Sequence, residues 1–555
     1  MEDDETQGEC TGKETAASGG NGCALTNKVQ ETWNNKTVEG NEPGVFVRVP
    51  DPNKVWVLDK DGALVAGDPD WTNNQGADNE VFLHGDKVGA VVNGILPKNL
   101  AVDLSNYQIR DDWTDSAKYV DFTNIDSDHV FVYVDGVDRT SEFDITLDGT
   151  VTTATAKASI LKGTAKQDRD RPVKLILLGE FLPWSEATDT GGETIILHNA
   201  GSETWNNQTK PTNKPPVFIW NPEPDKDVLG SKEQDGDESS INNQMVFPGQ
   251  IIKYEVKLDT HLPEGMAYDV TKFGLIDEYD PLFIPNKQSL TVTGRNGVVS
   301  AKNYTVTWND AAHSFELLFE QNWINEYLNT YEYNKPGAAK PDQDGRRYLV
   351  VTFDGKVSDD ATVGQEIINK GTQLINNSKV PTPEPEVTVP PTEPDKEDLR
   401  CTINPETGAM ENCNDIDGKY VVKGDYIDYR LTMDARPAAS KIAYRVHKLG
   451  MVDNYDEEYL SLDVKDIMVT VKSVGSDAAS KFTVGQNVTD MFNIQVDQET
   501  GTAYIFAKTV DTTLNTTGEV IPGDPQPADL AEYNKAPIDP LKDPGIDQDL
   551  LGNEY

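Results

Sequence analysis

One nine-residue segment occurs three times in this chain of 555 residues, and its long period constrains the fold more than any other feature. The copies begin at Asn27, Asn199 and Asn369, about 170 residues apart, and each ends in Asn-Asn. A second phrase, in which a lysine follows an acidic residue, a proline and Asp or Asn, recurs with the same period. Its lysines are Lys54, Lys226 and Lys396. A period of this length indicates repeated whole domains rather than a solenoid.

Between these phrases the chain alternates apolar and polar residues, as β-strands do. The clearest runs are Ile252 to Leu258 and Ile427 to Met433, each placed just after a turn that contains Gly249 or Gly424. Helical pattern is short and local, around 321–328. Regular strands separated by Gly, Asn and Asp turns predict an all-β chain of tandem, elaborated β-sandwich domains.

Two proline-rich segments, 210–224 and 380–394, predict the joints between these domains. Such segments are semi-rigid spacers, and we expect them to stay outside the sheets. The resulting division of the chain starts with a closing strand of a preceding domain and a linker. It continues with two complete sandwiches and a C-terminally incomplete third one, at 1–50, 51–216, 222–382 and 392–555.

The net charge of −45 argues against binding to nucleic acid or to anionic membranes, which would repel the chain. No apolar run is long enough to span a membrane, and the acidic start after Met1 is unlike a signal peptide. Because the repeats begin and end out of phase with the chain, we expect a piece of a longer exported protein.

The four cysteines form two close pairs, Cys10 with Cys23 and Cys401 with Cys413. Neither pair has CxxC spacing or a nearby histidine, so we predict two local disulfides rather than zinc sites. No cofactor is required by any motif. Calcium binding remains a possibility, because pairs of acidic residues occur in loops, although none of them completes an EF-hand. These pairs are Asp68/Asp70, Asp342/Asp344 and Asp415/Asp417. The sequence does not identify any metal.

A third phrase places an aspartate after two residues that are usually large and apolar and before an aromatic residue two positions on. The aspartates are Asp111, Asp277 and Asp453. Burial would raise the pKa of such a carboxyl group and lower that of a buried lysine, leaving a neutral amine that is a nucleophile. If the lysine of the first strand, the acid of a central strand and the asparagine of the last strand meet, the acid can polarise the asparagine amide. The products are a Lys–Asn isopeptide bond and ammonia.

Each of these residues alone has an ordinary explanation as a surface lysine, a strand end or a turn. Their matched spacing favours the cross-link: lysine and aspartate are 57, 51 and 57 residues apart, and Lys54–Asn199 and Lys226–Asn369 both span about 145. In the first repeat Arg110 could prevent burial of Asp111, and Asp112 would then be the assisting acid. Asp280 is the alternative in the second repeat.

With these motifs the chain resembles the isopeptide-forming domains in the C-terminal region of streptococcal antigen I/II adhesins, which also occur in other Gram-positive surface proteins. The resemblance implies immunoglobulin-like sandwiches with bonds Lys54–Asn199 and Lys226–Asn369, assisted by Asp111 and Asp277. It also implies that Lys396 and Asp453 lack a closing asparagine, and that Asn27 is the closing residue of an earlier domain. Attachment to peptidoglycan through a sorting motif outside this sequence is implied by the resemblance alone.

The predicted function is therefore an extracellular stalk at the bacterial cell wall, in which each bond carries tension past the hydrogen-bonded core. The full-length protein would bind a host surface or salivary glycoprotein, or another bacterium. A second possibility is that these domains themselves are the adhesive module. An enzyme with an external substrate is disfavoured: among 94 acidic residues, carboxylate pairs arise by chance, and neither GxSxG nor a P-loop is present.

Overall fold

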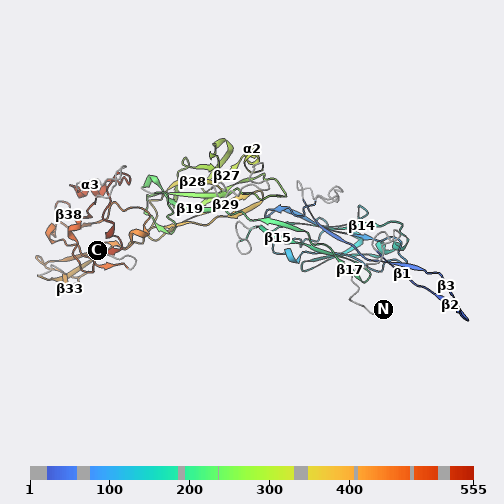
Figure 1. The fold of residues 1–555 in the computed structure, drawn as a ribbon. Coiled ribbons are helices and arrows are strands. Elements are labelled where there is room, and N and C mark those ends of the chain that lie inside the picture. The colour runs from blue at the N-terminus through green and yellow to red at the C-terminus, as the bar shows by residue number, and fades with distance from the viewer. Residues whose placement is uncertain are drawn as a thin grey trace.

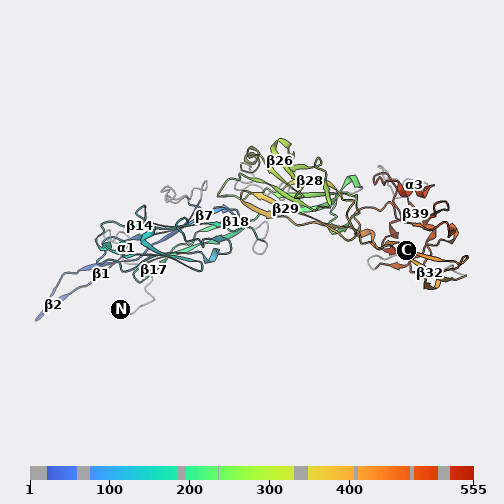
Figure 2. The same cartoon turned by 180° about the vertical axis from the view of Figure 1, so that it is seen from behind.

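The computed structural model is an elongated molecule with three successive β-rich bodies (Figures 1 and 2). The helices among the described residues are short: α1 (Ala158–Leu161), α2 (Gln321–Ile324) with a following π turn (Asn325–Asn329), and α3 (Leu530–Lys535). The structure describes residues 22–58, 76–185, 194–234, 237–329, 348–405, 410–475, 481–510 and 526–555.

The first sandwich has two main sheets. In the described residues, one sheet has the order β11-β10-β14-β7-β5, with β9 paired to β14, and the other has the order β12-β13-β8-β16-β17. The first sheet contains β5 (Asn53–Leu58), β7 (Lys87–Leu96), β9 (Val120–Asp121), β10 (Val130–Val134), β11 (Val137–Asp138) and β14 (Arg171–Phe181). The second contains β8 (Tyr107–Asp112), β12 (Phe143–Asp148), β13 (Val151–Ala156), β16 (Ala200–Trp205) and β17 (Gln208–Pro211). A small sheet, β15-β18-β6, joins β15 (Thr194–His198), β18 (Pro216–Trp220) and β6 (Val81–Phe82).

The second sandwich repeats this plan. Over the described residues its sheets have the orders β19-β21-β28-β24-β25, with β23 on β28, and β20-β31-β29-β22-β27-β26, with β30 on β29. The first sheet consists of β19 (Asp225–Gly230), β21 (Ile251–Asp259), β23 (Phe283–Pro285), β24 (Thr291–Gly294), β25 (Gly297–Val298) and β28 (Tyr348–Val357). The second consists of β20 (Gln244–Met245), β22 (Phe273–Tyr279), β26 (Tyr304–Asn309), β27 (Ser314–Phe319), β29 (Glu366–Ile375), β30 (Ser378–Pro381) and β31 (Glu386–Thr388).

The third body contains three smaller sheets in its described part, with the orders β33-β32-β34, β35-β40-β37 and β36-β39-β38. Their strands are β32 (Asp395–Ile403), β33 (Met410–Asp415), β34 (Asp428–Thr432), β35 (Asp434–Ala435), β36 (Gly450–Asn454), β37 (Ser473–Val474), β38 (Phe492–Asp497), β39 (Thr502–Ala507) and β40 (Asn553–Glu554). Figure 1 shows this body at the end of the molecule opposite β2 and β3.

An N-terminal pair of hairpins precedes the first sandwich. Strand β1 (Gly22–Thr26) pairs with β4 (Gly44–Arg48), and β2 (Gln30–Trp33) pairs with β3 (Lys36–Glu39). The tip formed by β2 and β3 extends away from the first sandwich (Figures 1 and 2). At its base, Arg48 forms a two-pronged ion pair with Asp170 at 2.6 and 2.7 Å.

The alternating pattern of 252–258 forms β21, in which Ile252, Tyr254, Val256 and Leu258 are fully buried. Successive side chains of a strand point to opposite faces, so this spacing turns all four toward the core. The turn before the strand contains Gly249 at φ +87°, a left-handed conformation that glycine adopts at little cost. Gly85 and Gly424 occupy the equivalent turns at φ +79° and +95°.

The prediction that the proline-rich segments stay out of the sheets is wrong. Residues of the first segment form β17 and β18, and residues of the second form β30 and β31. Strand β18 even lies between β15 and β6. The physical reason is the position of the prolines: Pro211, Pro216 and Pro381 lie at strand ends, where the missing N–H costs little. The sandwiches therefore extend to about residue 220 and about residue 388.

Apolar contacts continue across both junctions. Val81, Leu83 and Trp220, from the end of the first sandwich, belong to the buried cluster of the second. Tyr444 of the third body also belongs to that cluster, and its hydroxyl donates to the backbone oxygen of Ile251 at 2.6 Å. Each junction is thus a packed interface.

Candidate cross-linking sites

The second sandwich brings Lys226, Asp277 and Asn369 together in its interior. Lys226 lies on β19 in one sheet, whereas Asp277 on β22 and Asn369 on β29 lie in the other. Lys226 Nζ donates to Asp277 Oδ2 at 2.8 Å and to Asn369 Oδ1 at 2.8 Å. The side chains of the ion pair are fully buried, and so is Asn369.

The strand register explains why the two acceptors share a face. Asp277 lies directly opposite Gly371 in the antiparallel pair β22–β29, and Asn369 is two residues from that glycine. Residues two apart on a strand point to the same side. The strands that carry the lysine and the asparagine lie in different sheets and face each other across the sandwich, with the lysine reaching between the sheets.

Burial sets the protonation of the pair. Desolvation lowers the pKa of Lys226, opposed by the nearby carboxylate of Asp277. Desolvation likewise raises the pKa of Asp277, opposed chiefly by the nearby charge of Lys226. Both shifts favour the neutral amine beside the protonated acid, since charged forms are destabilised away from water.

Two atoms of this site, Asp277 Oδ1 and Asn369 Nδ2, have no hydrogen-bond partner among the described residues. A buried polar group left without a partner costs roughly 1–3 kcal/mol, so an unpaired buried amide calls for an explanation. A free amide nitrogen beside an amine and a carboxyl group is the arrangement expected of a leaving group.

The first sandwich contains the same triad. Lys54 on β5 donates to Asp111 Oδ2 on β8, and Asn199 lies between β15 and β16. All three residues are fully buried, and desolvation lowers the pKa of Lys54 well below its usual value. Asp111 lies opposite Gly201, two residues from the asparagine, as in the second sandwich. Both amide atoms of Asn199 lack a partner.

The backbone of Lys54 is also tied to the end of its sandwich. Lys54 N donates to Asn213 Oδ1 at 2.7 Å, and Asn213 Nδ2 donates back to Lys54 O at 2.9 Å. This two-way bond holds the lysine strand against the segment that follows the closing asparagine.

The suggestion that Arg110 prevents burial of Asp111 is wrong. Strand alternation points Arg110 and Asp112 outward, where they form an ion pair at 3.3 Å, and turns Asp111 inward. Asp112 is therefore no substitute. Asp280, the alternative acid of the second repeat, accepts from Leu282 N in a turn, whereas Asp277 is the acid that contacts Lys226.

Sequence reasoning missed the glycine opposite each aspartate. A Cβ on Gly371 would lie 2.7 Å from Thr382 Oγ1 and 3.3 Å from Lys226 Cδ, so the glycine leaves room for the lysine stem. A Cβ on Gly201 would likewise meet backbone and side-chain atoms at 2.8 Å. The signal was present in the repeated segment as Asn-x-Gly in two of its three copies.

The third body presents the lysine and the acid in a different environment. Lys396 Nζ lies 2.6 Å from Asp453 Oδ1 and 4.6 Å from the centre of the Tyr429 ring. The lysine side chain is 39% exposed and the aspartate 11%. Strand β36, which carries Asp453, pairs with β39 and with no other described strand. Asn553 lies elsewhere, in β40, and its amide donates to main-chain oxygens around Leu550.

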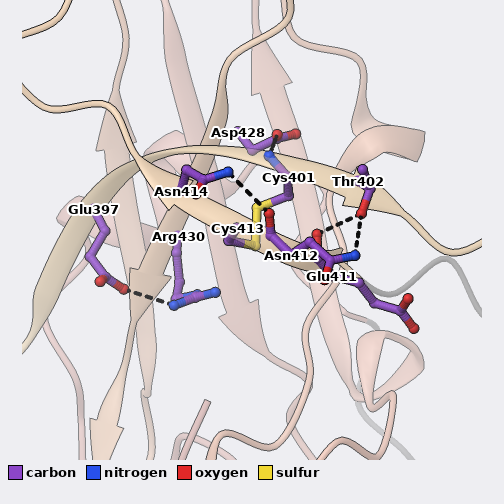
Figure 3. Close-up of a disulfide and its surroundings, with 9 residues drawn as sticks. All are labelled: Glu397, Cys401, Thr402, Glu411, Asn412, Cys413, Asn414, Asp428 and Arg430. Atoms are coloured by element: carbon purple, nitrogen blue, oxygen red, sulfur yellow. Dashed lines mark hydrogen bonds and ion pairs between the residues drawn. A yellow bond between two sulfur atoms is a disulfide. The ribbon is translucent and has the colours of Figure 1, made fainter.

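Asn27 is exposed at the start of the N-terminal hairpin, on the opposite end of the molecule (Figure 1). Cys401 and Cys413 form a disulfide between β32 and β33 (Figure 3). Cys10 lies outside the described residues and the Cys23 side chain is not described, so their disulfide stays a prediction.

No group of three or more potential metal ligands occurs among the described residues. Asp415 accepts from Asp417 N in a turn, and the other acidic pairs, at 68/70 and 342/344, lie outside the described residues. Calcium binding stays a prediction for those loops.

Residues 224–385 and 407–555 match the model of the cell surface antigen I/II C2 terminal domain, and these matches cover more than half of the chain. The chain belongs to this family. The antigen I/II family is one of cell-surface adhesins rather than enzymes, so this chain is an extracellular adhesin domain array. No described helix is long and apolar enough to cross a membrane.

Solved structures with similar folds include two antigen I/II C-terminal domains. That of BspA from Streptococcus agalactiae is 16% identical, with a TM-score of 0.41, and the match covers 61% of this chain and 100% of that one. That of AspA from Streptococcus pyogenes is 14% identical, with a TM-score of 0.42, and the match covers 62% of this chain and 100% of that one. The major pilin subunit BcpA of Bacillus cereus is 9% identical, with a TM-score of 0.24, and the match covers 66% of this chain and 82% of that one. No curated protein sequence matches the chain.

Proposed function

We propose that this antigen I/II chain is a covalently closed segment of an adhesin stalk. Its first two sandwiches each form one intramolecular isopeptide bond, Lys54–Asn199 and Lys226–Asn369. The observation that carries the proposal is the position of Lys226 Nζ, which is buried and lies 2.8 Å from Asp277 Oδ2 and 2.8 Å from Oδ1 of the amide whose carbon it would attack.

The reaction needs no cofactor. The neutral amine of Lys226 adds to Cγ of Asn369 while protonated Asp277 gives its proton to Oδ1, which polarises the amide. The Asp277 carboxylate then accepts a proton from Nζ and passes it to Nδ2. The Cγ–Nδ2 bond breaks and ammonia leaves. The proton on Oδ1 returns to Asp277 as the carbonyl re-forms, and the Nζ–Cγ amide remains. Each sandwich reacts once and has no turnover.

The bond changes how the domain carries force. Lysine and asparagine are 143 residues apart in the second sandwich, so closing that loop stabilises the fold by about 5 kcal/mol if it acts as a disulfide of the same span would. Tension that enters at β19 leaves through β29 over a covalent link, and the hydrogen-bonded strands between them carry little of it. Such domains in series suit a rod that holds a binding tip away from the cell.

In this role the chain contacts partners only through the full-length protein, which we propose to be attached to peptidoglycan at one end. At its tip it would bind a host surface or salivary glycoprotein, or another bacterium. Direct ligand binding by these three bodies is the second candidate, and an isolated-chain binding assay would separate the two.

Intact mass is the decisive measurement. Two closed sandwiches give a chain lighter than its sequence by two ammonia molecules, and fragmentation should recover peptides joined through Lys54 and Asn199 and through Lys226 and Asn369. A Lys226→Arg variant should lose one of these bonds and regain one ammonia mass. An unshifted mass in the unmodified protein would overturn the proposal.

A further inference from the structure

The same short segment makes the contact between neighbouring bodies at both junctions. It reads Met-Ala-Tyr at 266–268 in the second sandwich and Ile-Ala-Tyr at 442–444 in the third body, and we call these the junction segments. Each follows the strand that pairs with the lysine strand of its own body, β21 in one and β34 in the other. The alanine and tyrosine of each segment contact the buried cluster of the preceding sandwich. The two junctions are therefore built alike.

Each junction segment adds to the edge of a very short strand of the preceding sandwich. Val81 N donates to Gly265 O and Ala267 N donates to Val81 O, both at 2.7 Å, so the first segment pairs with β6. Ala443 N donates in the same way to Met245 O in β20, at 2.8 Å. Strands β6 and β20 are two residues long. A strand this short has few hydrogen bonds of its own, so a neighbour on each side matters to its stability.

These short strands lead directly to the reacting asparagines. Strand β6 pairs with β18, and β18 pairs with β15, which ends at His198, one residue before Asn199. In the second sandwich β20 pairs with β31, and β31 pairs with β29 up to Ile368, one residue before Asn369. Two strands therefore connect each junction segment to the strand that carries the asparagine.

The tyrosine of each junction segment contacts the sheet that carries the lysine. Tyr268 OH donates to Lys87 O at 3.0 Å, and Tyr444 OH donates to Ile251 O at 2.6 Å. These acceptors are the first residues of β7 and β21, the strands that pair with the lysine strands β5 and β19. The Tyr268 ring also packs on that of Phe82, with the centroids 5.9 Å apart. One segment thus holds both sides of the preceding sandwich, the lysine sheet directly and the asparagine through β6 or β20.

The distance between these two sides decides whether the bond can form, because the lysine and the asparagine come from opposite sheets. In the second sandwich Lys226 Nζ already lies 2.8 Å from Asn369 Oδ1. Groups held in such a geometry react as one unit, and a displacement of about 1 Å can slow a reaction about a hundredfold. Contacts that hold the two sheets together therefore affect the rate of the reaction.

We propose that each junction segment clamps the sandwich before it, so that docking of the next body accelerates the Lys–Asn bond of that sandwich. The inference rests on the proposed isopeptide chemistry. Tyr268 acts on the first sandwich and Tyr444 on the second, in both cases as positioning residues. The reaction itself is unchanged: the Nζ–Cγ amide forms, the Cγ–Nδ2 bond breaks and one ammonia leaves.

The test makes the full chain by cell-free synthesis, so that each bond starts to form in newly made protein. Samples are stopped in acid at intervals, and the two joined peptides are quantified by mass spectrometry. Tyr268→Ala should slow the first-sandwich bond by about tenfold, the population change expected from losing a hydrogen bond and its packing, and leave the second-sandwich bond unchanged. Tyr444→Ala should do the reverse. Both variants should reach the parent's end point, because the segments take no part in the bond exchange.

A graded pair of variants tests the role of the hydroxyl group. Tyr268→Phe keeps the ring against Phe82 and loses only the bond to Lys87 O. Its first-sandwich rate should lie between those of the parent and Tyr268→Ala. Asp269→Ala is the matched control, since this neighbouring side chain is exposed, and it should react at the parent's rate.

Two results overturn the clamp and leave the proposed function standing. One is parent rates for both bonds in Tyr268→Ala and in Tyr444→Ala. The other is an equal slowing of both bonds in each variant, which would reflect general damage to folding. If the unmodified chain loses no ammonia, the clamp and the proposed function both fail.

Discussion

The second and third bodies carry the same lysine, acid and aromatic ring, and they differ in what covers them. Lys226 lies 5.7 Å from the centre of the Tyr254 ring, and Lys396 lies 4.6 Å from that of Tyr429. Each lysine contacts the aspartate of its repeat. Lys226 is sealed between two sheets, whereas the Lys396 side chain is 39% exposed.

This difference separates a buried lysine–acid pair from a surface ion pair. Water stabilises both charges of an exposed pair, which contributes at most about 1 kcal/mol to stability. Removing water by adding the strand that carries the asparagine shifts the pKa of Lys226 and of Asp277 toward the neutral forms. The closing strand thus supplies both the electrophile and the conditions under which the nucleophile is active.

Limited digestion with trypsin should give the largest contrast between the two bodies. We expect early cuts at exposed sites of the third body, such as Arg400 and Lys423, while a fragment of about 53–388 persists. Cleavage follows the population of opened chain, and about 5 kcal/mol of added stability lowers that population more than a thousandfold. Equal digestion rates of the second and third bodies would contradict the comparison.

Asp277→Ala should remove the bond from the second sandwich without removing either reacting group. The variant should regain one ammonia mass and lose about 5 kcal/mol of stability, the contribution of the closed loop. Calorimetry and intact mass measure the two effects. Asp280→Ala is the control, because that carboxylate only caps the turn at Leu282 N, and it should keep the bond. Bond formation in Asp277→Ala would show that the acid is not needed.

Gly371→Val should push β29 away from Lys226 and so expose this lysine more, as Lys396 is exposed in the third body. Its Cβ would approach Thr382 Oγ1 at 2.7 Å, and overpacking of this kind costs roughly 1–3 kcal/mol. We expect a slower loss of ammonia during refolding. In the N-terminal hairpins the larger and smaller residues are exchanged, with Val29 at the position of Gly371 and Gly40 at that of Thr382. Adding Thr382→Gly reproduces this exchange and should restore the rate. A double variant as slow as the single one would contradict this steric explanation.

An effect that appears only as pH changes should come from the turn aspartates. Burial raises the pKa of Asp86 to about 7, whereas its counterpart Asp425 is exposed. An unfolded aspartate has a pKa of about 4, so between about pH 4 and 7 the folded chain keeps a proton that the unfolded chain releases. The free energy of unfolding should therefore fall as pH rises through this window.

Asp86→Asn should remove that pH dependence, since its amide oxygen can still accept from Leu83 N. The variant should equal the parent near pH 4 and be more stable above pH about 7, by an amount on the order of 1 kcal/mol per pH unit crossed. Denaturant unfolding at several pH values measures it. A pH profile that stays the same in Asp86→Asn would contradict this effect of burial.

Much of the architecture was predictable because it depends on local pattern. Alternation over 252–258 identified β21, and recurrence of Lys226, Asp277 and Asn369 at matched spacing singled out three residues that meet in the folded chain. The proline-rich segments misled the prediction, since whether a proline blocks a strand depends on its place in the hydrogen-bond ladder, which local composition does not reveal. Burial of Asp111 beside Arg110 was misjudged because strand register, not the neighbour's charge, decides which side chain faces inward.

By itself, the sequence determined the repeated domains, their β-class and the residue types that a Lys–Asn cross-link needs, because these follow from period, alternation and spacing. It also predicted that Lys396, unlike Lys226, lacks a closing asparagine, but it could not show how far each lysine is removed from water. Tertiary structure made that distinction: β29 lies against β22 and excludes water from one lysine, while β36 has no such described neighbour and leaves the other solvated. Reactivity here depends on desolvation, and desolvation is a property of strands brought together from positions more than a hundred residues apart.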